Sequence, residues 1–317
     1  MSARHIVVTG ATGFVGSAVL RRLAAQDPQA VVHAVSRTRP PIAYGGRWIG
    51  ADLADAESLH GVCDGADVLL SLASCTGPDA DRCTAVNSTG TAALMAEAGR
   101  AGVRRIVQLS TCAVYGPGPH TGQDVGELTT APVSAASSSR LAGEEPVLDA
   151  GGLVLRAGLV LGRGDRWVVP ALVDAFRRVP AAWGGGTGLA SFVDVDDLAR
   201  LIAAFALGDG AAAGAVGVLH AHHPVPVRNR DLMDALADHR VLPAGPAADW
   251  PWRRCLDALA TTPGWVSERQ FTLLARDHWY RADEAWRLAG IAPGPGPLGR
   301  LGAAAQWYRE RGAAAPG

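Results

Sequence analysis

Apolar and polar residues alternate along the first half of the chain with two different periods. After a short apolar run at residues 5–8, Val19, Leu20 and Leu23 recur at helical spacing within residues 16–25. Further β-rich runs lie at residues 31–35, 68–72 and 105–109, and a second helical stretch lies at residues 92–101. Strands that alternate with helices in this way indicate βαβ units and a parallel sheet.

The second half continues this pattern and then changes character near residue 224. Short β-like runs lie among helical stretches at residues 153–156, 192–193 and 216–220. From residue 224 onward the chain carries six of its nine tryptophans, together with several prolines and loop-like stretches. This composition predicts a smaller, mainly helical lobe, whose tryptophans either fill its own core or stack on a flat ligand.

A glycine-rich turn directly follows the first predicted strand and opens the first predicted helix. It reads Thr9-Gly10-Ala11-Thr12-Gly13-Phe14-Val15-Gly16. A tight turn, a close approach of backbone to a pyrophosphate, and close packing of helix on strand each require a missing side chain. The helix N-terminus then offers free N–H groups to the phosphates. We expect cofactor contacts from Gly10, Thr12, Gly13, Phe14, Val15 and Gly16.

These features predict an α/β fold with a doubly wound parallel Rossmann sheet and a smaller, mainly helical C-terminal substrate lobe. We assign residues 1–165 and about 190–223 to the dinucleotide-binding Rossmann domain. Residues 166–189 and 224–317 form the expected substrate-binding lobe. The cofactor is expected across the carboxyl ends of the strands, with the substrate in the cleft beneath the second lobe.

The residues after the second predicted strand bear on the choice of dinucleotide. A NAD site usually places an acid there, about 20 residues beyond the glycine turn, to bind the ribose 2′-hydroxyl. Here the chain has Arg37 and Arg39 and no acid. Planar guanidinium groups suit a 2′-phosphate and the adenine face, which favours NADPH/NADP. The simpler alternative is that one arginine, more readily Arg39, is a solvated loop charge.

The composition narrows the function further. All 29 basic side chains other than histidine are arginine, which excludes any mechanism that needs a lysine. A formal net charge of −1 leaves no electrostatic footprint for nucleic acid or an anionic membrane surface. No apolar run approaches the roughly 18 residues of a membrane span, so we expect a cytoplasmic protein. The five cysteines contain no CxxC pair, which favours reduced thiols over a metal or disulfide framework.

Further motifs extend from residue 51 to the end of the chain. They lie at residues 51–53, 70–74, 109–116, 192–199, 279–293 and 307–309, with an asparagine at position 87. Together with the glycine turn they resemble the extended short-chain dehydrogenase/reductase family, which includes sugar-nucleotide epimerases and dihydroflavonol-type reductases. The resemblance implies an adenine contact at Asp52 and Leu53. It also implies a cofactor ribose passing Leu72, Ala73 and Ser74.

The family's catalytic trio is a Ser/Thr, a Tyr, and a Lys four residues after the Tyr. Thr111 matches the Ser/Thr, and we expect it to hydrogen-bond the substrate carbonyl unless it simply finishes its strand. The family spacing places Ala136 where the tyrosine belongs and Arg140 where the lysine belongs. No tyrosine lies between Tyr115 and Tyr280, so a register shift does not restore the pattern. Arg140 can bind the cofactor ribose or a phosphate, but it supplies no proton.

The missing tyrosine changes the expected substrate. Losing a general acid typically costs about 10²–10⁴ in rate, unless a phenol of the substrate shares its proton with the adjacent carbonyl. This favours an NADPH-dependent ketoreductase of an aromatic polyketide. The chain resembles the atypical ketoreductases of angucycline antibiotic pathways in lacking the tyrosine. Trp250, Trp252 and Arg253 are the expected substrate-binding residues, because aromatics beside arginines stack on flat ligands.

Two other functions remain open at this point. A Rossmann protein without the Tyr/Lys pair can bind NADP(H) without turnover and act as a redox sensor or regulator. A sugar-nucleotide epimerase or dehydratase is disfavoured, because those reactions rely most heavily on the tyrosine. The sequence leaves open the oligomeric state and whether the proton comes from a substrate phenol or from water.

Other polar side chains near the vacated position have simple interpretations. Tyr115 belongs to a turn whose tyrosine packs more often than it reacts. His120 is expected to be a solvated loop histidine rather than a substitute acid. The serines at 137–139 are candidates for holding a water in a proton relay. The histidines within residues 220–223 lack a clear carboxylate partner, so we expect no metal site.

Overall fold

A seven-stranded parallel sheet forms the centre of the molecule, in the order β12-β7-β5-β4-β1-β2-β3. The computed structural model describes residues 3–243 and 248–312. The strands are β1 (His5–Thr9), β2 (Val31–Ser36), β3 (Gly46–Gly50), β4 (Val68–Ser71), β5 (Arg105–Thr111), β7 (Leu153–Ala157) and β12 (Gly217–His220). The strand order reverses between β1 and β4, which makes this a doubly wound Rossmann sheet, as the sequence predicts. Ligands bind such sheets at the carboxyl ends of the strands beside the reversal.

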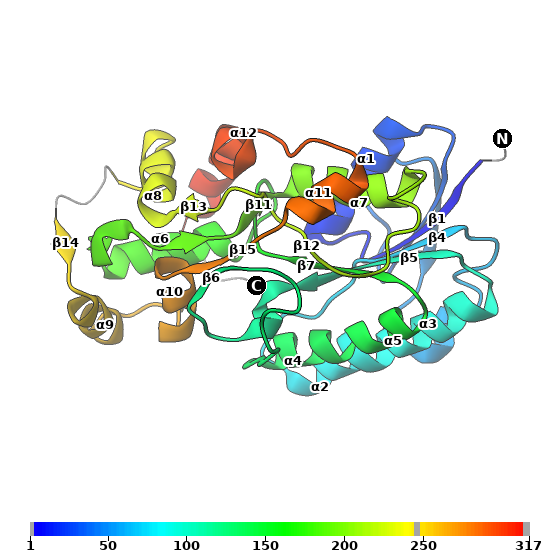
Figure 1. Cartoon of the computed structure of the whole chain (residues 1–317), viewed down its shortest axis with the longest axis horizontal. Helices are drawn as coiled ribbons and strands as arrows, with labels where there is room; N and C mark the ends of the chain where they lie inside the picture. The colour runs from blue at the N-terminus through cyan, green and yellow to red at the C-terminus, as the bar shows by residue number, and fades with distance from the viewer. Residues whose placement is uncertain (1–2, 244–247, 313–317) are drawn as a thin grey trace.

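Helices cover both faces of this sheet (Figure 1). One face carries α1 (Phe14–Gln26), α7 (Val195–Leu207) and α11 (Asp283–Ala289), and the other carries η1 (Ala56–Leu59), α3 (Gly90–Arg100), α4 (Ala135–Ala142) and α5 (Glu144–Asp149). Ile6 and Val8 of β1 pack in the core between the sheet and the first group of helices. Val7, between them, packs in the core on the opposite face. Burial on both faces explains why these strands are continuous apolar runs rather than alternating ones.

The helix after β4 has three parts that follow one another without a break. These are α2 (Ala80–Thr84), a wider π turn η2 (Ala85–Thr89), and α3. Gly90 begins α3 where the helix passes the backbone of Leu53, and a Cβ there would lie 2.1 Å from the Leu53 carbonyl oxygen. The helix and the loop after β3 therefore pack backbone against backbone. Short π turns inside helices are frequent at functional sites.

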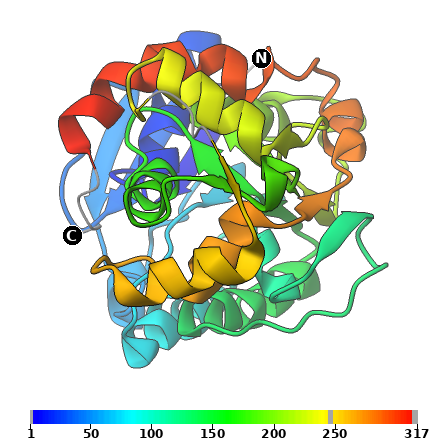
Figure 2. The same cartoon turned by 90° about the vertical axis from the view of Figure 1, so that its left-hand side faces the viewer.

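The remaining elements lie outside the seven-stranded sheet, in the part of the molecule that faces the viewer in Figure 2. Its helices are α6 (Val168–Arg178), α8 (Asn229–Asp238), α9 (Trp252–Thr261), α10 (Glu268–Ala275) and α12 (Gly296–Arg311). Its short strands are β6 (His120–Gln123), β8 (Leu159–Leu161), β9 (Ala182–Trp183), β10 (Leu189–Ala190), β11 (Phe192–Asp194), β13 (Val227–Arg228), β14 (Asp249–Trp250) and β15 (His278–Tyr280), with η4 (Gly184–Gly186) after β9. Trp183 and Phe271 are buried in its separate core. The residue boundaries between the two lobes stay a prediction.

The strands predicted from apolar runs are all present, whereas β3 was not predicted. β3 lies at the edge of the sheet and is mostly exposed, with glycine at both ends. An edge strand of this kind lacks the apolar run that marks the buried strands. β6 was also missed, and it joins β15 in the small sheet of order β13-β10-β15-β6. Among the described residues, no helix has the length and apolar character needed to cross a membrane.

Replacing Gly90 by alanine is expected to destabilise the protein, because the new methyl group collides with the Leu53 carbonyl oxygen. Overpacking of this kind costs about 1–3 kcal/mol of the free energy of unfolding. Gly99 of the same helix is the matched control, since nothing lies within 4 Å of a Cβ there. Gly99→Ala should stabilise the helix by about 0.5–1 kcal/mol. Urea unfolding measures both changes, and equal effects of the two substitutions would contradict the backbone contact.

Candidate active site

The glycine turn after β1 brings three backbone segments together. Gly10 has a positive φ of 68°, and a Cβ on it would lie 2.6 Å from the Ala73 nitrogen. A Cβ on Gly16 would lie 2.1 Å from the Gly10 carbonyl oxygen, so α1 packs directly on the turn. The Gly13 N–H donates to the Gly10 carbonyl oxygen at 2.9 Å and closes the turn. Gly10 and Gly16 therefore make contacts that no side chain would allow, whereas a Cβ on Gly13 would meet the Gly10 carbonyl oxygen at 3.1 Å.

The N-terminus of α1 is open to an anion. Gly13 caps this helix without a side chain, and the first turn contains no acid. Thr12 and Gly13 are exposed, whereas Phe14 and Val15 are half-buried. Free N–H groups and the positive end of the helix dipole attract phosphate at such a terminus. The residues present thus fit a dinucleotide pyrophosphate.

The end of β4 forms the wall beside the glycine turn. The Thr9 hydroxyl oxygen accepts hydrogen bonds from the Leu72 and Ala73 N–H groups at 3.2 and 3.4 Å. Leu72 is buried and Ser74 is exposed, so the chain reaches the surface directly beyond β4. The segment predicted to pass the ribose is therefore fastened to the turn predicted to hold the pyrophosphate.

Asp52 and Leu53 follow β3 at the expected adenine end of the groove. Leu53 is buried beneath this loop. Asp52 accepts a hydrogen bond from the Ala54 N–H at 3.0 Å and forms an ion pair with Arg82 of α2 at 2.9 Å. Partial burial acts in the opposite direction, but these two contacts together lower the pKa of Asp52. Asp52 is a carboxylate at neutral pH, and its role as an adenine contact stays a prediction.

Arg37 and Arg39 extend from the loop after β2. Both side chains are exposed, and within the described part of the chain neither forms an ion pair. The Ser36 hydroxyl donates to the Thr38 carbonyl oxygen at 2.7 Å, and the Trp48 indole N–H donates to the Ser36 carbonyl oxygen at 3.1 Å. These bonds hold the loop, and both guanidinium groups are left available to an anionic ligand.

Thr111 lies where β5 ends and the short turn η3 (Cys112–Tyr115) begins. Its side chain caps this turn, because the hydroxyl oxygen accepts the Ala113 N–H at 3.1 Å. The residue is half-buried. A hydroxyl that accepts one hydrogen bond still has its own proton to donate. The geometry therefore suits the predicted hydrogen bond from Thr111 to a substrate carbonyl.

Ala136 and Arg140 lie four residues apart on α4. Ala136 contributes a methyl group where the family has a phenol. The Arg140 guanidinium donates to the Leu109 carbonyl oxygen of β5 at 2.9 Å. Burial lowers the pKa of Arg140 to about 10, which still leaves a cation at neutral pH. Arg140 therefore joins α4 to β5 as a buried cation.

Asn87, in the π turn, fastens three parts of the site to one another. Its side-chain oxygen accepts the Cys75 N–H at 2.7 Å, and its amide donates to the Cys75 carbonyl oxygen at 2.8 Å and to the Ser139 hydroxyl at 2.9 Å. A Cβ on Gly143 would lie 2.0 Å from the Asn87 carbonyl oxygen. The helix that carries the vacated catalytic position is thus held directly against the segment beyond β4.

The serines considered for a proton relay are mostly engaged in these contacts. Ser139 is buried, and besides its bond from Asn87 it donates to the Ala135 carbonyl oxygen at 2.7 Å. Ser137 is buried in a capping box with Ser134 at the start of α4. Ser138 is exposed. A relay through the serines stays a prediction, and two of the three have structural partners.

A buried polar network lies behind Thr111. The Ser110 hydroxyl donates to Glu144, and Glu144 forms an ion pair with Arg156 at 2.6 Å. Arg156 also donates to the Tyr115 phenol oxygen at 2.8 Å. The pairing of Glu144 with Arg156 was missed from the sequence. Its signal is an arginine inside an apolar strand, since a buried charge needs a partner.

The hydrogen bonds of His220 decide where the Tyr115 proton points. His220 Nδ1 lies 2.8 Å from the Arg281 carbonyl oxygen, which only accepts, so Nδ1 carries the proton. His220 Nε2 is then an acceptor, and the Tyr115 hydroxyl donates to it at 2.8 Å. Burial raises the pKa of Tyr115. The phenol proton is committed inside the protein, so Tyr115 does not replace the missing acid.

Three histidines pack around Tyr280 next to this network, and a fourth, His278, packs on one of them. The rings of His120, His220 and His222 lie 5.4, 5.1 and 6.2 Å from the Tyr280 ring, and the His278 ring lies 5.0 Å from that of His120. All four are buried. The prediction that His120 is a solvated loop histidine is therefore wrong, because β6 carries it into the protein. Burial lowers the pKa of His120, so it is neutral at pH 7.

Trp250, Trp252 and Arg253 lie together around the start of α9. Figure 1 shows β14 and α9 at one end of the long axis, with β1 and β4 toward the other end. Trp250 is covered by the Arg254 guanidinium at 3.9 Å, whereas Arg253 is exposed. Trp252 stacks on Phe271, with ring centroids 5.2 Å apart. The structure thus gives both indoles protein partners, and their substrate role stays a prediction.

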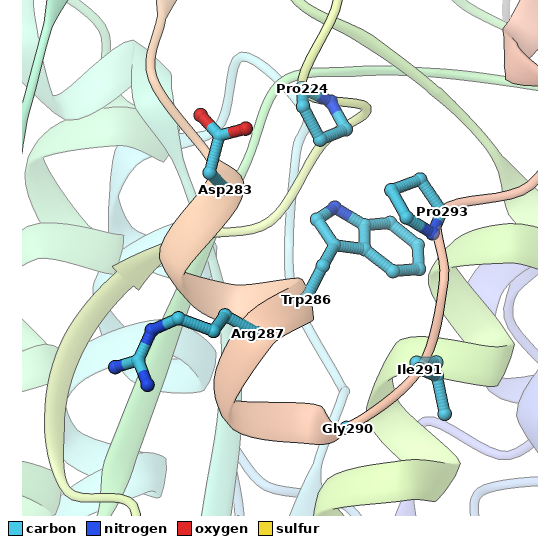
Figure 3. A pocket seen from close by; sticks show the side chains of 7 residues that line it. All are labelled: Pro224, Asp283, Trp286, Arg287, Gly290, Ile291 and Pro293. Atoms are coloured by element: carbon cyan, nitrogen blue, oxygen red, sulfur yellow. The ribbon is translucent and has the colours of Figure 1, made fainter.

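Two cavities lie near the surface. One, of about 350 Å³, lies on α11 and is lined by Trp286 between Pro224 and Pro293 (Figure 3). The other, of about 540 Å³, adjoins the first turn of α1 and is lined by Phe14 and Asp194 among others. Only the second contains a predicted cofactor residue. Among the residues that the structure describes, no group of three His, Cys, Asp or Glu is arranged to hold a metal ion.

The fold and the glycine turn define a dinucleotide-binding α/β protein. Residues 6–214 match the model of the NAD dependent epimerase/dehydratase family. The match spans more than half of the chain, and the protein belongs to this family. It is accordingly an NAD(P)-dependent enzyme of the oxidoreductase type.

Two curated relatives and one solved structure are among the proteins similar to this chain. The 2-alkyl-3-oxoalkanoate reductase of Stenotrophomonas maltophilia is 27% identical over 91% of this chain and 94% of its own. The 4-hydroxy-2-methyl-3-oxo-4-farnesyl-3,4-dihydroquinoline-1-oxide ketoreductase of Stigmatella aurantiaca is 30% identical over 56% of this chain and 57% of its own. MoeE5 in complex with UDP-glucuronic acid and NAD superposes with a TM-score of 0.74 at 22% identity, covering 96% of this chain and 99% of MoeE5. This last likeness concerns the fold alone.

The buried histidines are expected to make stability depend on pH. Burial lowers the pKa to about 4 for His220 and His278 and to about 3 for His222. A lowered pKa in the folded state means that the unfolded chain binds protons first, so stability is lost as pH falls below about 6.5. Between pH 7 and 5 the loss is about 2 kcal/mol for each such histidine. Urea unfolding at pH 7, 6 and 5 measures it.

A matched pair of variants separates these histidines from other titrating groups. Burial raises the pKa of Asp194 to about 6, which acts in the opposite direction. The quantity to compare between wild type and variants is therefore the slope of the free energy of unfolding against pH. His222→Gln should flatten the slope, whereas His60→Gln, at an exposed position, should not change it. An unchanged slope in His222→Gln would count against the buried neutral imidazole.

Proposed function

We propose that this protein is an NADPH-dependent ketoreductase that reduces a carbonyl of a polycyclic aromatic polyketide of the angucyclinone type, in antibiotic biosynthesis. The observation that carries the proposal is the lack of a phenol hydroxyl at the vacated catalytic position. Ala136 offers a methyl group, Arg140 stays a cation bonded to the Leu109 carbonyl oxygen, and the Tyr115 proton points to His220. A proton from the substrate's own phenol, or from water, then completes the reduction.

Each residue of the site has a defined task in this proposal. NADPH supplies the hydride when it is bound. The open end of α1 at Gly13 holds its pyrophosphate, and Arg37 and Arg39 bind its 2′-phosphate. The Thr111 hydroxyl donates to the carbonyl oxygen and so stabilises the charge that develops there. Arg140 fixes α4 against β5, which keeps the substrate's phenol and carbonyl beside the nicotinamide.

The relatives support carbonyl reduction. The Stigmatella relative is named as a ketoreductase of a farnesylated quinoline oxide, and the Stenotrophomonas relative as a reductase of a 3-oxo acid. The chain also resembles the angucyclinone ketoreductase of the simocyclinone antibiotic pathway in lacking the tyrosine. Trp250, Trp252 and Arg253 are proposed as substrate contacts. A flat ligand there displaces the guanidinium groups of Arg254 and Arg276, which now lie over the two indoles.

Arg37→Ala is expected to weaken NADPH binding much more than NADH binding, because the side chain is proposed to contact the 2′-phosphate. The loss of one charged hydrogen bond corresponds to roughly a tenfold to hundredfold rise in the NADPH Kd. Fluorescence titration with both cofactors measures the change. Arg269→Ala, an exposed arginine on α10, is the control and should leave both Kd values unchanged. An equal loss for NADH and NADPH would argue against a 2′-phosphate contact.

Purified protein is expected to oxidise NADPH with an angucyclinone ketone whose carbonyl lies beside a free phenol. Methylating that phenol removes the proton source and should slow the reaction by about 10²–10⁴. The consumption of NADPH at saturating ketone measures both rates. If neither ketone oxidised NADPH, the proposed ketoreductase activity would be wrong.

The double variant Ala136→Tyr with Arg140→Lys tests the origin of the proton. It should change the rate with the free phenol little, because the substrate already supplies the acid. With the methylated ketone it should raise the rate, because the new phenol takes over that task. A large gain with the free phenol would instead describe an ordinary reductase that has lost its acid. The single variant Arg140→Lys serves as the matched control.

A further inference from the structure

Two thiols lie close together beyond the carboxyl end of β4, beside the predicted dinucleotide site. Cys75 follows the end of β4, and Cys83 lies on α2, with their Sγ atoms 3.3 Å apart. Cys75 is half-buried and Cys83 is fully buried. The other three cysteines are buried, and none of them contacts a second thiol in the described chain. The pair thus combines a partly exposed cysteine with a fully buried one.

The two sulfurs need only a small movement to become bonded. A disulfide has an S–S length of about 2.05 Å, so the atoms must approach by about 1.2 Å from their present separation. Asn87 holds Cys75 through both its N–H and its carbonyl group. Residues 78–80, which lead into α2, are exposed. Rotation of the two side chains, with a small adjustment of α2, is expected to close this gap.

We propose that Cys75 and Cys83 form a redox modification site that closes to an intramolecular disulfide on oxidation by hydrogen peroxide. The Cys75 thiolate attacks a peroxide oxygen, and the O–O bond breaks to give a sulfenic acid and water. The Cys83 sulfur then attacks the Cys75 sulfur and releases the second water. Two thiols are oxidised by two electrons and one peroxide is reduced to two waters. A dithiol reverses the change by exchange.

The positions of the two thiols support this order of events. Cys75 is the less buried of the two residues, and the reactive species in thiol oxidation is the thiolate. Burial raises the pKa of Cys83 to about 11, so it stays a thiol until a sulfenic acid forms beside it. The Cys83 sulfur also lies 3.6 Å from the Cys75 carbonyl oxygen and 3.4 Å from the Gly77 carbonyl oxygen. These contacts hold the sulfur against the loop between the two cysteines.

Formation of the disulfide is expected to affect the predicted dinucleotide site through the neighbours of each cysteine. Cys75 continues the segment whose Ala73 packs on Gly10 of the glycine turn. Arg82, beside Cys83, forms the ion pair with Asp52. Movement of α2 disturbs this ion pair. If the groove binds NADPH as proposed above, the oxidised protein should bind it more weakly, by roughly two- to fivefold, the effect of one exposed ion pair.

The test is peroxide treatment of the full-length protein, followed by alkylation of free thiols and tryptic mass spectrometry. Cleavage after Arg82 separates the two cysteines, so the disulfide appears as a cross-linked pair of peptides. Reduction by dithiothreitol separates this pair. The expected result is loss of two free thiols, with Cys63, Cys112 and Cys255 still alkylated under denaturing conditions. No cross-link, or oxidation spread evenly over all five cysteines, would overturn the proposal.

Single variants sharpen the result. Cys75→Ser and Cys83→Ser should each abolish the cross-link, whereas Cys255→Ser, a buried cysteine without a neighbouring thiol, should keep it. Sulfenic acid should be trapped by dimedone at Cys75 in Cys83→Ser. Trapping at Cys83 in Cys75→Ser would contradict the assigned order. The wild-type cross-link remains decisive if a variant fails to fold.

The NADPH Kd of reduced and oxidised protein, measured by fluorescence, separates this inference from the proposed function. A reduced protein that does not bind NADPH refutes the cofactor assignment, while the cross-link is still decided by mass spectrometry. A cross-link with an unchanged NADPH Kd overturns the coupling between the thiols and the groove.

Discussion

Contact of backbone with backbone is the constraint on which the rest of this structure depends. Gly16 against Gly10, Gly90 against the loop after β3, and Gly143 against Asn87 all approach too closely for a Cβ. These contacts set the position of α1, α3 and α4 on the sheet. Because the glycine turn leads into α1 and the vacated catalytic position lies on α4, the same contacts place both parts of the predicted site.

The buried charged residues near the predicted catalytic position make structural contacts. Arg140 donates to β5, and Arg156 neutralises buried Glu144 and donates to the Tyr115 phenol. Breaking one partner of such a buried pair is strongly destabilising, because it leaves an uncompensated charge. The network therefore keeps Tyr115 away from catalysis and fixes the strand end that carries Thr111. Under the proposed function, such a site supplies position and hydrogen bonding, and the proton comes from the substrate or from water.

Much of the fold and of the cofactor site could be predicted from local sequence. The buried strands are continuous apolar runs, and the glycine turn lies between strand and helix as its spacing indicates. The losses at Ala136 and Arg140 follow from the resemblance to the family's catalytic pattern, and they stay a prediction. Edge strand β3 and the strand β6 were missed, because their residues carry little apolar signal. His120 was placed in solvent for the same reason: the burial of β6 comes from β15, far along the chain.

The sequence by itself determined the parallel sheet, the position of the dinucleotide turn and the absence of the usual acid and lysine. These depend on residues close together in the chain, where period, spacing and residue type act directly. The tertiary structure decided the rest. It places the Tyr115 hydroxyl so that it donates to His220, and it bonds the Asn87 side chain to Cys75 and Ser139. It also brings Cys75 close to Cys83. Each of these joins segments that only the packing of helices on the sheet brings within hydrogen-bond distance.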